Sequence, residues 1–308
     1  MNYLPSNLKF KDGIAFIGDI SLLEVAKKYS TPLYVYDWEH LRDNINYFTN
    51  AFGTDTYYRY AAKAFICKGL VKELDKYGWG VDVVSGGEMA TVQETVGSLE
   101  NAIFNGTFKR QDEIEYFIQN NGGHISIDNR YEVGMLDEVA TSLNKKQAVI
   151  MRINLDVGAE THPMVLTSGY DQQFGISIGF AEEALDQITS SKSLLFSGIH
   201  VHVGSQIKEP DRYKLAMSSC SDFMNSHFEK VEAETVFNAG GGFFSPYAGD
   251  EVDHELSIYS EAIHNGIKEH WTKEYKLMIE PGRALVNNPG IILYTAGAIK
   301  ADRGEKPY

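Results

Sequence analysis

The chain has 308 residues, 43% hydrophobic and 23% charged, which is the composition of a globular protein with one large or two ordinary domains. Its net charge of −14 excludes a basic surface that would attract nucleic acid or anionic lipid. The first residues lack a basic segment followed by an apolar run, and no stretch approaches the roughly 20 apolar residues of a membrane helix. We therefore expect neither a nucleic acid nor a membrane as a partner.

Cys67 and Cys220 are the two cysteines of the chain, and they lie far apart in the sequence. Their spacing indicates neither a disulfide framework nor a zinc site. Together with the absence of a targeting segment, this cysteine usage predicts a cytoplasmic protein.

Alternating elements make up most of the chain. After β-like runs within residues 8–37, short β-rich runs alternate with amphipathic stretches from residue 56 to about 280, as in repeated βα units. Helices are expected between the strands, for example at Arg110–Asn120 and Asp211–Lys230. The predicted strands are Thr56–Ala62, Gly80–Val84, Ala102–Asn105, His124–Ile127, Ala148–Ile153, Phe196–Val201, Thr235–Asn238 and Lys276–Ile279.

Eight such strands in about 250 residues predict an α/β fold, a (β/α)₈ TIM-like barrel whose active site lies at the carboxyl ends of the strands. A doubly wound open sheet is the alternative, because periodicity does not distinguish a closed sheet from an open one. The number of strands favours the barrel.

The ends of the chain do not follow this repeat. We expect residues 1–37 to be the N-terminal segment of a second, β-rich domain, residues 38–285 to form the barrel, and residues 286–308 to begin an incomplete return to the β-rich domain. A strand partner for the β-like run at 289–300 is expected beyond residue 308. The terminal runs should then leave unpaired edges or exposed apolar surface.

Chemically useful residues follow several predicted strands. Lys63 ends the first one, and a buried lysine there could act as an amine nucleophile, although a surface lysine is the simpler interpretation of the spacing. Gly240, Gly241 and Gly242 close the seventh strand and could surround a phosphate with backbone N–H groups, or form a turn with no ligand.

Charged residues and a histidine pair complete this set. Glu280 and Arg283 end the eighth strand, where they could serve a site or form a surface ion pair. His200 and His202 share one face of the sixth strand. That spacing can hold a metal, but no further ligand cluster completes such a site. One ring packed on a planar ligand, with the other hydrogen-bonded inside the barrel, is the more economical interpretation.

In this order, the segments resemble the alanine racemase-like superfamily of fold-type III enzymes, which use pyridoxal 5′-phosphate. The resemblance covers nearly the whole chain and is closest to the meso-diaminopimelate decarboxylase branch. It is carried by TPLYVYD (31–37), YAAKA (60–64), GWGVDVVSGGEM (78–89), FNGTFK (104–109), ISIDN (125–129), MRINLDV (151–157), THP (161–163), QFGI (173–176), GIHVHVGSQI (198–207), AGGGF (239–243) and EPGR (280–283).

The resemblance implies a role for each matching residue. Lys63 would form the Schiff base with the cofactor aldehyde, His202 would stack on the ring, and these two would be the catalytic residues. Glu280 would keep the ring nitrogen protonated, which makes the ring an electron sink. The remaining positions would bind or support the cofactor: Gly240, Gly241, Gly242 and Gly282 at the phosphate, Arg283 at the phosphate or a substrate carboxylate, and Asp82 and Ser205 nearby.

The implied reaction converts meso-diaminopimelate to L-lysine and CO₂ in lysine biosynthesis. Three departures from the branch leave the substrate open: Gln173 stands where a lysine is usual, Ser168 lies within the Thr-Gly pair, and residues 105–108 replace His-Gly-Asn-Asn. Decarboxylation of ornithine, lysine or arginine is one alternative. A truncated relative that binds the cofactor without catalysis, or regulates a complete subunit, is another.

Members of this family continue for about another hundred residues, the size of an ordinary second domain. That part carries a Cys-Glu-Ser-x-Asp motif whose cysteine reaches the active site of a neighbouring subunit. Neither Cys67 nor Cys220 lies in such a motif. The resemblance therefore implies a homodimer when the C-terminal domain is present, and it leaves open whether this chain alone is active.

Overall fold

The computed structural model describes residues 3–155, 173–247 and 255–298. The chain divides into two compact units. The larger unit takes in the described residues among 47–244 and 253–284, and the smaller takes in those among 1–46, 245–252 and 285–308. Each unit is described by itself.

A closed ring of eight parallel strands forms the larger unit. Each strand pairs in parallel with the next along the chain, and β13 pairs with β5 to close the ring. The predicted barrel is confirmed, and every predicted strand lies within two residues of its observed bounds. The strands are β5 (Tyr57–Ala61), β6 (Gly80–Val83), β7 (Ala102–Phe104), β8 (His124–Ile127), β9 (Gln147–Asn154), β11 (Leu194–His200), β12 (Val236–Asn238) and β13 (Lys276–Ile279), with the short β10 (Ile176–Ser177) beside β9.

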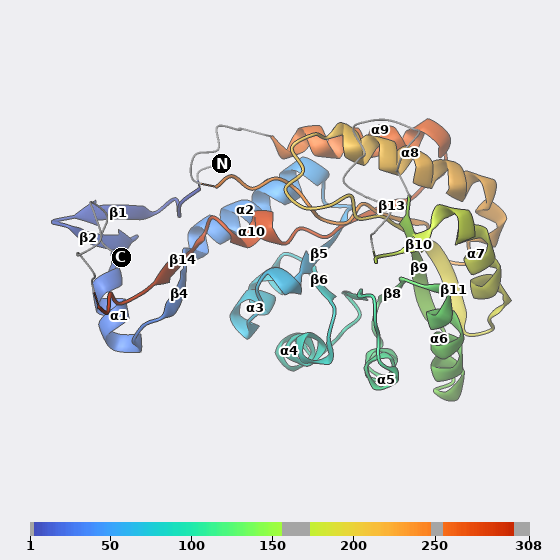
Figure 1. Cartoon of the computed structure of the whole chain (residues 1–308), viewed down its shortest axis with the longest axis horizontal. Coiled ribbons are helices and arrows are strands. Elements are labelled where there is room, and N and C mark those ends of the chain that lie inside the picture. The colour runs from blue at the N-terminus through green and yellow to red at the C-terminus, as the bar shows by residue number, and fades with distance from the viewer. Residues whose placement is uncertain (1–2, 156–172, 248–254, 299–308) are drawn as a thin grey trace. The chain divides into compact units, whose positions relative to one another are not determined.

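Helices follow the strands and cover the outside of the ring (Figure 1). Two of them begin at side-chain caps directly after strands: Ser85 accepts the Glu88 N–H at the start of α4, and Asn129 accepts the Glu132 N–H at the start of α6. The predicted second helical stretch is α8 followed by a 3₁₀ turn. The helices are α2 (Trp38–Phe52), α3 (Lys68–Lys76), α4 (Gly86–Val96), α5 (Gln111–Gln119), α6 (Arg130–Ser142), α7 (Ala181–Ser190), α8 (Asp211–Ser226), α9 (Leu256–His270) and α10 (Arg283–Val286).

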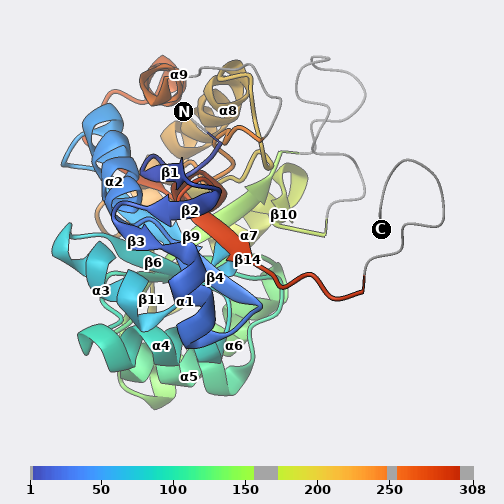
Figure 2. The same cartoon turned by 90° about the vertical axis from the view of Figure 1, so that its left-hand side faces the viewer.

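The smaller unit contains antiparallel strands (Figure 2). Its last strand pairs with β4, so the expectation that this strand needs a partner beyond residue 308 is wrong. The expected exposed apolar surface is present, since Phe10 of β1 is 73% exposed and Tyr34 of β4 is 66% exposed. The elements are β1 (Leu8–Lys11), β2 (Ile14–Ile17), β3 (Ile20–Ser21), α1 (Leu22–Tyr29), β4 (Leu33–Tyr36) and β14 (Gly290–Leu293).

None of the helices in the described ranges is long and apolar enough to cross a membrane.

Candidate active site

Side chains alternate along the barrel strands and form a sharp boundary inside the ring. An apolar layer consists of four buried residues: Ile103, Ile150, Val236 and Met278. Two positions later on the same strands, and therefore on the same face, the chain places Asn105, Arg152, Asn238 and Glu280. The apolar layer fills the barrel, so these polar groups gather at the carboxyl ends of the strands.

A cavity of about 810 Å³ lies at this end of the barrel. It brings Lys63 and Glu280 together, although they belong to the first and last strands of the ring in chain order. It is lined by Lys63, Val84, Asn105, Gly106, Thr107, Phe108, Arg152, Gln173, Phe174, His200, His202, Gly204, Ser205 and Glu280.

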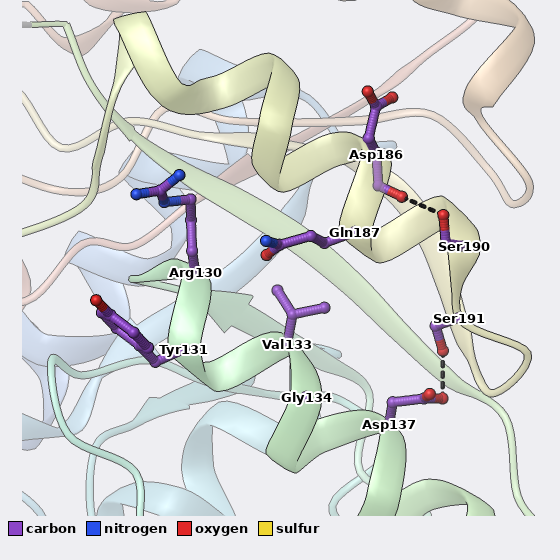
Figure 3. Close-up of a pocket in the computed structure, with 9 residues that line it drawn as sticks. All are labelled: Arg130, Tyr131, Val133, Gly134, Asp137, Asp186, Gln187, Ser190 and Ser191. Carbon is purple, nitrogen blue, oxygen red and sulfur yellow. Dashed lines mark hydrogen bonds between the residues drawn. The ribbon is translucent and has the colours of Figure 1, made fainter.

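A second hollow, of about 610 Å³, lies on the outer surface between α6 and α7 (Figure 3). Its polar groups bond to one another. Ser191 Oγ donates to the Asp137 carboxylate, and Ser190 Oγ donates to the Asp186 carbonyl oxygen at 2.7 Å. These bonds serve the helices themselves, so we place the chemistry in the cavity at the strand ends.

Lys63 lies in a 3₁₀ turn, Ala62–Ala64, which directly follows β5. Its side chain is 56% exposed, and its Nζ is 3.8 Å from Oδ2 of the fully buried Asp82. The side chain is therefore not buried, in agreement with the simpler interpretation of the spacing. What distinguishes Lys63 from an ordinary surface lysine is that it lines the cavity beside a carboxyl group.

Glu280 is the most heavily bonded acid of the site. Its Oε1 accepts hydrogen bonds from Asn238 Nδ2 at 2.7 Å and Asn105 Nδ2 at 2.8 Å, and its Oε2 lies 3.4 Å from His200 Nε2. Burial opposes ionisation, but His200, the charge of Lys63 and the Asn238 hydrogen bond together hold the pKa of Glu280 below its ordinary value. Glu280 is therefore ionised at neutral pH.

Asp82 shows the opposite behaviour. Burial and the negative charge of Glu280 raise the pKa of Asp82 to about 7, although Lys63 and the hydrogen bond from Asn105 Nδ2 at 2.8 Å oppose the change. Asp82 can therefore gain or lose a proton near neutral pH, within 3.8 Å of the Lys63 amine.

The two histidines occupy different surroundings. His200 ends β11 inside the barrel, where its Nδ1 lies 3.0 Å from Ser126 Oγ. His202 lies two residues beyond, and its Nδ1 accepts the Gly241 N–H at 3.2 Å. Burial, together with the charges of Lys63 and Arg152, lowers the pKa of His202 to about 3. The His202 ring is therefore neutral at the cavity wall.

Backbone packing explains the run of three glycines. A Cβ atom would lie 2.7 Å from the Val201 carbonyl oxygen at Gly240, 2.2 Å from that of Glu280 at Gly241, and 2.2 Å from that of Gly204 at Gly242. Gly240 and Gly242 also have φ values of +67° and +97°, which other residues rarely adopt. The run borders the cavity through its contacts with His202 and Gly204, which line it.

Some predicted site residues lie elsewhere. Ser205 lines the cavity, but Gly282 and Arg283 are not among the lining residues. Gly282 packs against Ala61, and Arg283 begins α10 with an exposed side chain. The motif at 161–163 and Ser168 fall outside the described residues.

Arg152 is a lining residue that the sequence interpretation left without a role. Its guanidinium lies 3.4 Å from Asp128 Oδ1 and 4.8 Å from the centre of the Phe174 ring. Phe108, 79% exposed, lines the same cavity. The sequence pattern that could have identified Arg152 as a cavity residue is a polar residue two positions after a buried strand residue. Asn238 and Glu280 show the same pattern.

Known proteins are similar to this chain in sequence and in fold. The family "pyridoxal-dependent decarboxylase, pyridoxal binding domain" matches residues 38–287. The chain belongs to this family. Diaminopimelate decarboxylase of Bacillus subtilis (strain 168) is 32% identical over 302 residues, which are 95% of this chain and 69% of the relative, and that of Staphylococcus aureus (strain COL) is 33% identical over 94% and 70%. A crystal structure of diaminopimelate decarboxylase from M. jannaschii with L-lysine has a TM-score of 0.87, 30% identity, and coverage of 97% and 71%.

The cavity has the features that a pyridoxal 5′-phosphate group requires. Three buried polar atoms at or beside it have no hydrogen-bond partner among the described residues: Asp82 Oδ2, Asn105 Oδ1 and His200 Nε2. Lys63 supplies an amine for an aldehyde, and the glycine run supplies a close-approach backbone for a phosphate. The residues present therefore fit the cofactor. Within the described ranges, no group of three His, Cys, Asp or Glu residues could hold a metal ion.

Proposed function

We propose that this pyridoxal-dependent decarboxylase acts on meso-diaminopimelate and releases L-lysine and CO₂, a step of lysine biosynthesis. The observation that carries the proposal is the placement of Lys63 and Glu280 in one cavity, in a chain that is 32% and 33% identical to two diaminopimelate decarboxylases. The cofactor supplies an electron sink for the bond that breaks when CO₂ leaves.

Each residue contributes through its own chemistry. Lys63 would hold the cofactor aldehyde through its amine, and the ionised Glu280 would favour a protonated ring nitrogen. The neutral His202 ring packs against the cofactor ring without adding charge. Asp82 supports Lys63 by taking or returning a proton near neutral pH. Gly240, Gly241, Gly242, Gly282 and Ser205 would hold the phosphate, and Arg283 would hold the phosphate or a substrate carboxylate.

The choice of substrate rests on the relatives and on Thr161-His162-Pro163 in the sequence. Arg152 adds a guanidinium at the cavity wall, which suits a substrate with carboxylates at both ends. The rivals are decarboxylation of ornithine, lysine or arginine and binding of cofactor without turnover. CO₂ release from each amino acid, measured with the 308-residue chain, separates them. Preference for another amino acid would contradict the substrate, and no release from any would favour the non-catalytic relative.

Replacement of Lys63 tests the cofactor site directly. With pyridoxal 5′-phosphate, the wild-type chain should show a visible absorption band that shifts on borohydride reduction. Lys63→Ala should lose this band and about 10²–10⁴-fold in turnover, because the covalent amine is gone. Lys68→Ala is the control, since Lys68 is 61% exposed and its amine pairs with Glu94 of the next helix. An unchanged band in Lys63→Ala would refute the assignment.

We also propose that the protein works in the cytoplasm and forms a homodimer when a complete C-terminal domain is present. The cysteine usage and the acidic composition support the first point. Sedimentation of this chain and of a longer chain that includes that domain would test the second.

A further inference from the structure

Asn105 occupies a place in the site that the proposed function does not use. It directly follows β7, its side chain is buried with 4% exposure, and it lines the cavity. Its Nδ2 donates to Asp82 Oδ1 at 2.8 Å and to Glu280 Oε1 at 2.8 Å. One amide group thus joins the carboxyl beside Lys63 to the carboxyl proposed for the ring nitrogen.

A shared donor matters because two buried carboxylates repel each other in a medium that screens poorly. An amide NH₂ has two hydrogens and no charge, so it can bond to both acids without neutralising either. Asn105 satisfies this geometry with two equal distances. Asn238 offers a comparison, because its Nδ2 donates to Glu280 at 2.7 Å while its Oδ1 accepts the Gly240 N–H at 2.8 Å.

The surroundings of the two acids differ in number of donors. Glu280 accepts from both asparagines and lies 3.4 Å from His200 Nε2, whereas Asp82 accepts from Asn105 through Oδ1 and its Oδ2 has no hydrogen-bond partner among the described residues. A proton held by the pair is therefore more stable on Asp82. Among the described residues, the charged or titratable groups that act on the pair include Lys63 and Glu88 at Asp82, and Lys63, His200, His202 and Arg59 at Glu280.

We propose that Asn105 is a positioning residue that ties Asp82 to Glu280 and stabilises the ionised form of Asp82 beside Lys63, so that Asp82 can release its proton while Glu280 stays ionised. The inference deepens the proposed function, on which it rests for the roles of the two acids. On this inference, an uncharged side chain that contacts both acids influences which of them carries a proton.

Titration of the carboxyl groups tests this inference without any cofactor. The full chain, labelled with ¹³C at its carboxyl carbons, is titrated by NMR, and the Asp82 signal is identified by its loss in Asp82→Asn. The wild-type signal should titrate near pH 7. In Asn105→Ala its midpoint should rise by about one unit, because the single donor to the ionised Asp82 is lost. Asn238→Ala, the matched control, removes an amide that donates to Glu280 and accepts from the Gly240 N–H, and it should shift Asp82 much less.

Two results would overturn the inference. One is an Asp82 midpoint in Asn105→Ala that stays at the wild-type value, and the other is an equal shift in Asn238→Ala. If circular dichroism shows that Asn105→Ala is unfolded, Asn105→Ser takes its place. A single hydroxyl hydrogen can serve only one acid at a time, so this variant should raise the midpoint by a smaller amount, and no rise would again overturn the inference.

The same variants report on the bound state. With pyridoxal 5′-phosphate, the pH midpoint of the visible band should move upward in Asn105→Ala in parallel with the NMR midpoint, and an unmoved band would contradict the proposed link. A wild-type chain that binds no cofactor would refute the proposed function instead, and the NMR titration would still decide the role of Asn105.

Discussion

Asp82 and Glu280 are both buried carboxyl groups, yet their surroundings move their pKa values in opposite directions. The difference comes from the partners of each acid. Glu280 has two amide donors and a histidine, while Asp82 has one amide donor and lies under the negative field of Glu280. Two carboxyl groups thus serve the site in different ways. Glu280 is a permanent anion, and Asp82 can exchange a proton near neutral pH.

This difference predicts a pH dependence of stability. The pKa of Asp82 is about 7 in the folded chain and near its ordinary value of 3.8 when unfolded, so the folded state binds more protons between pH 4 and pH 7. The contribution of Asp82 to the unfolding free energy therefore falls as pH rises through this window. Asp82→Asn cannot ionise, and its unfolding free energy relative to wild type should rise by on the order of 2–4 kcal/mol from pH 4 to pH 8. Urea denaturation at several pH values measures this, and parallel curves would contradict it.

At the scale of elements, the loop after β12 depends on backbone packing that tolerates no side chain. Gly241→Ala places a Cβ 2.2 Å from the Glu280 carbonyl oxygen, so the strand end that carries Glu280 must move. We expect a loss of about 1–3 kcal/mol in unfolding free energy and a weaker affinity for inorganic phosphate. Gly134→Ala in α6 is the control, since nothing lies within 4 Å of its Cβ position and alanine should stabilise the helix by about 0.5–1 kcal/mol. Equal effects of the two changes would argue against this account of the loop.

A buried ion pair connects the segment after β7 to α6. Lys109 Nζ lies 3.0 Å from Glu132 Oε2, and both side chains are buried. Lys109→Met should lower the unfolding free energy by about 3–5 kcal/mol, because the Glu132 charge would remain buried without its cation. Adding Glu132→Leu should recover part of the loss. The exposed pair Lys68–Glu94 is the control, and Lys68→Met should cost no more than about 1 kcal/mol. Chemical denaturation compares the variants, and a small loss in Lys109→Met would show that the pair adds little.

At the scale of the whole molecule, the smaller unit exposes apolar side chains on edge strands. In the two-stranded sheet, Tyr34 of β4 pairs with Ile292 of β14, and they are 66% and 40% exposed. Such a surface favours association. We expect the average mass in sedimentation to rise with concentration and Tyr34→Lys to reduce this rise. Tyr131→Lys, at a 91% exposed position of α6, should leave it unchanged. Association that is insensitive to Tyr34 would place the contact elsewhere.

The sequence alone predicted the strands, the (β/α)₈ fold and four of the cavity residues, which are Lys63, His202, Ser205 and Glu280. These features are local: a buried strand residue followed two positions later by a polar one, as in Met278 and Glu280, is visible in the order of amino acids. Arg283 shows where locality fails, since it follows the same strand but starts a helix with its side chain exposed. Lys63 shows it too, because the spacing suggests an ordinary surface lysine, whereas the fold places its exposed side chain at the cavity beside Asp82.

Only the tertiary structure decided which residues each polar side chain contacts. Asn105 donates hydrogen bonds to Asp82, 23 positions before it, and to Glu280, 175 positions after it. No local sequence pattern predicts these two bonds. They depend on the closure of the ring between β13 and β5, which brings the first and last strands side by side. Strand periodicity reflects burial residue by residue, whereas hydrogen bonds and pKa values depend on distances across the barrel. The amino-acid order therefore determined which groups reach the strand ends, and the closed barrel determined which acid keeps its proton.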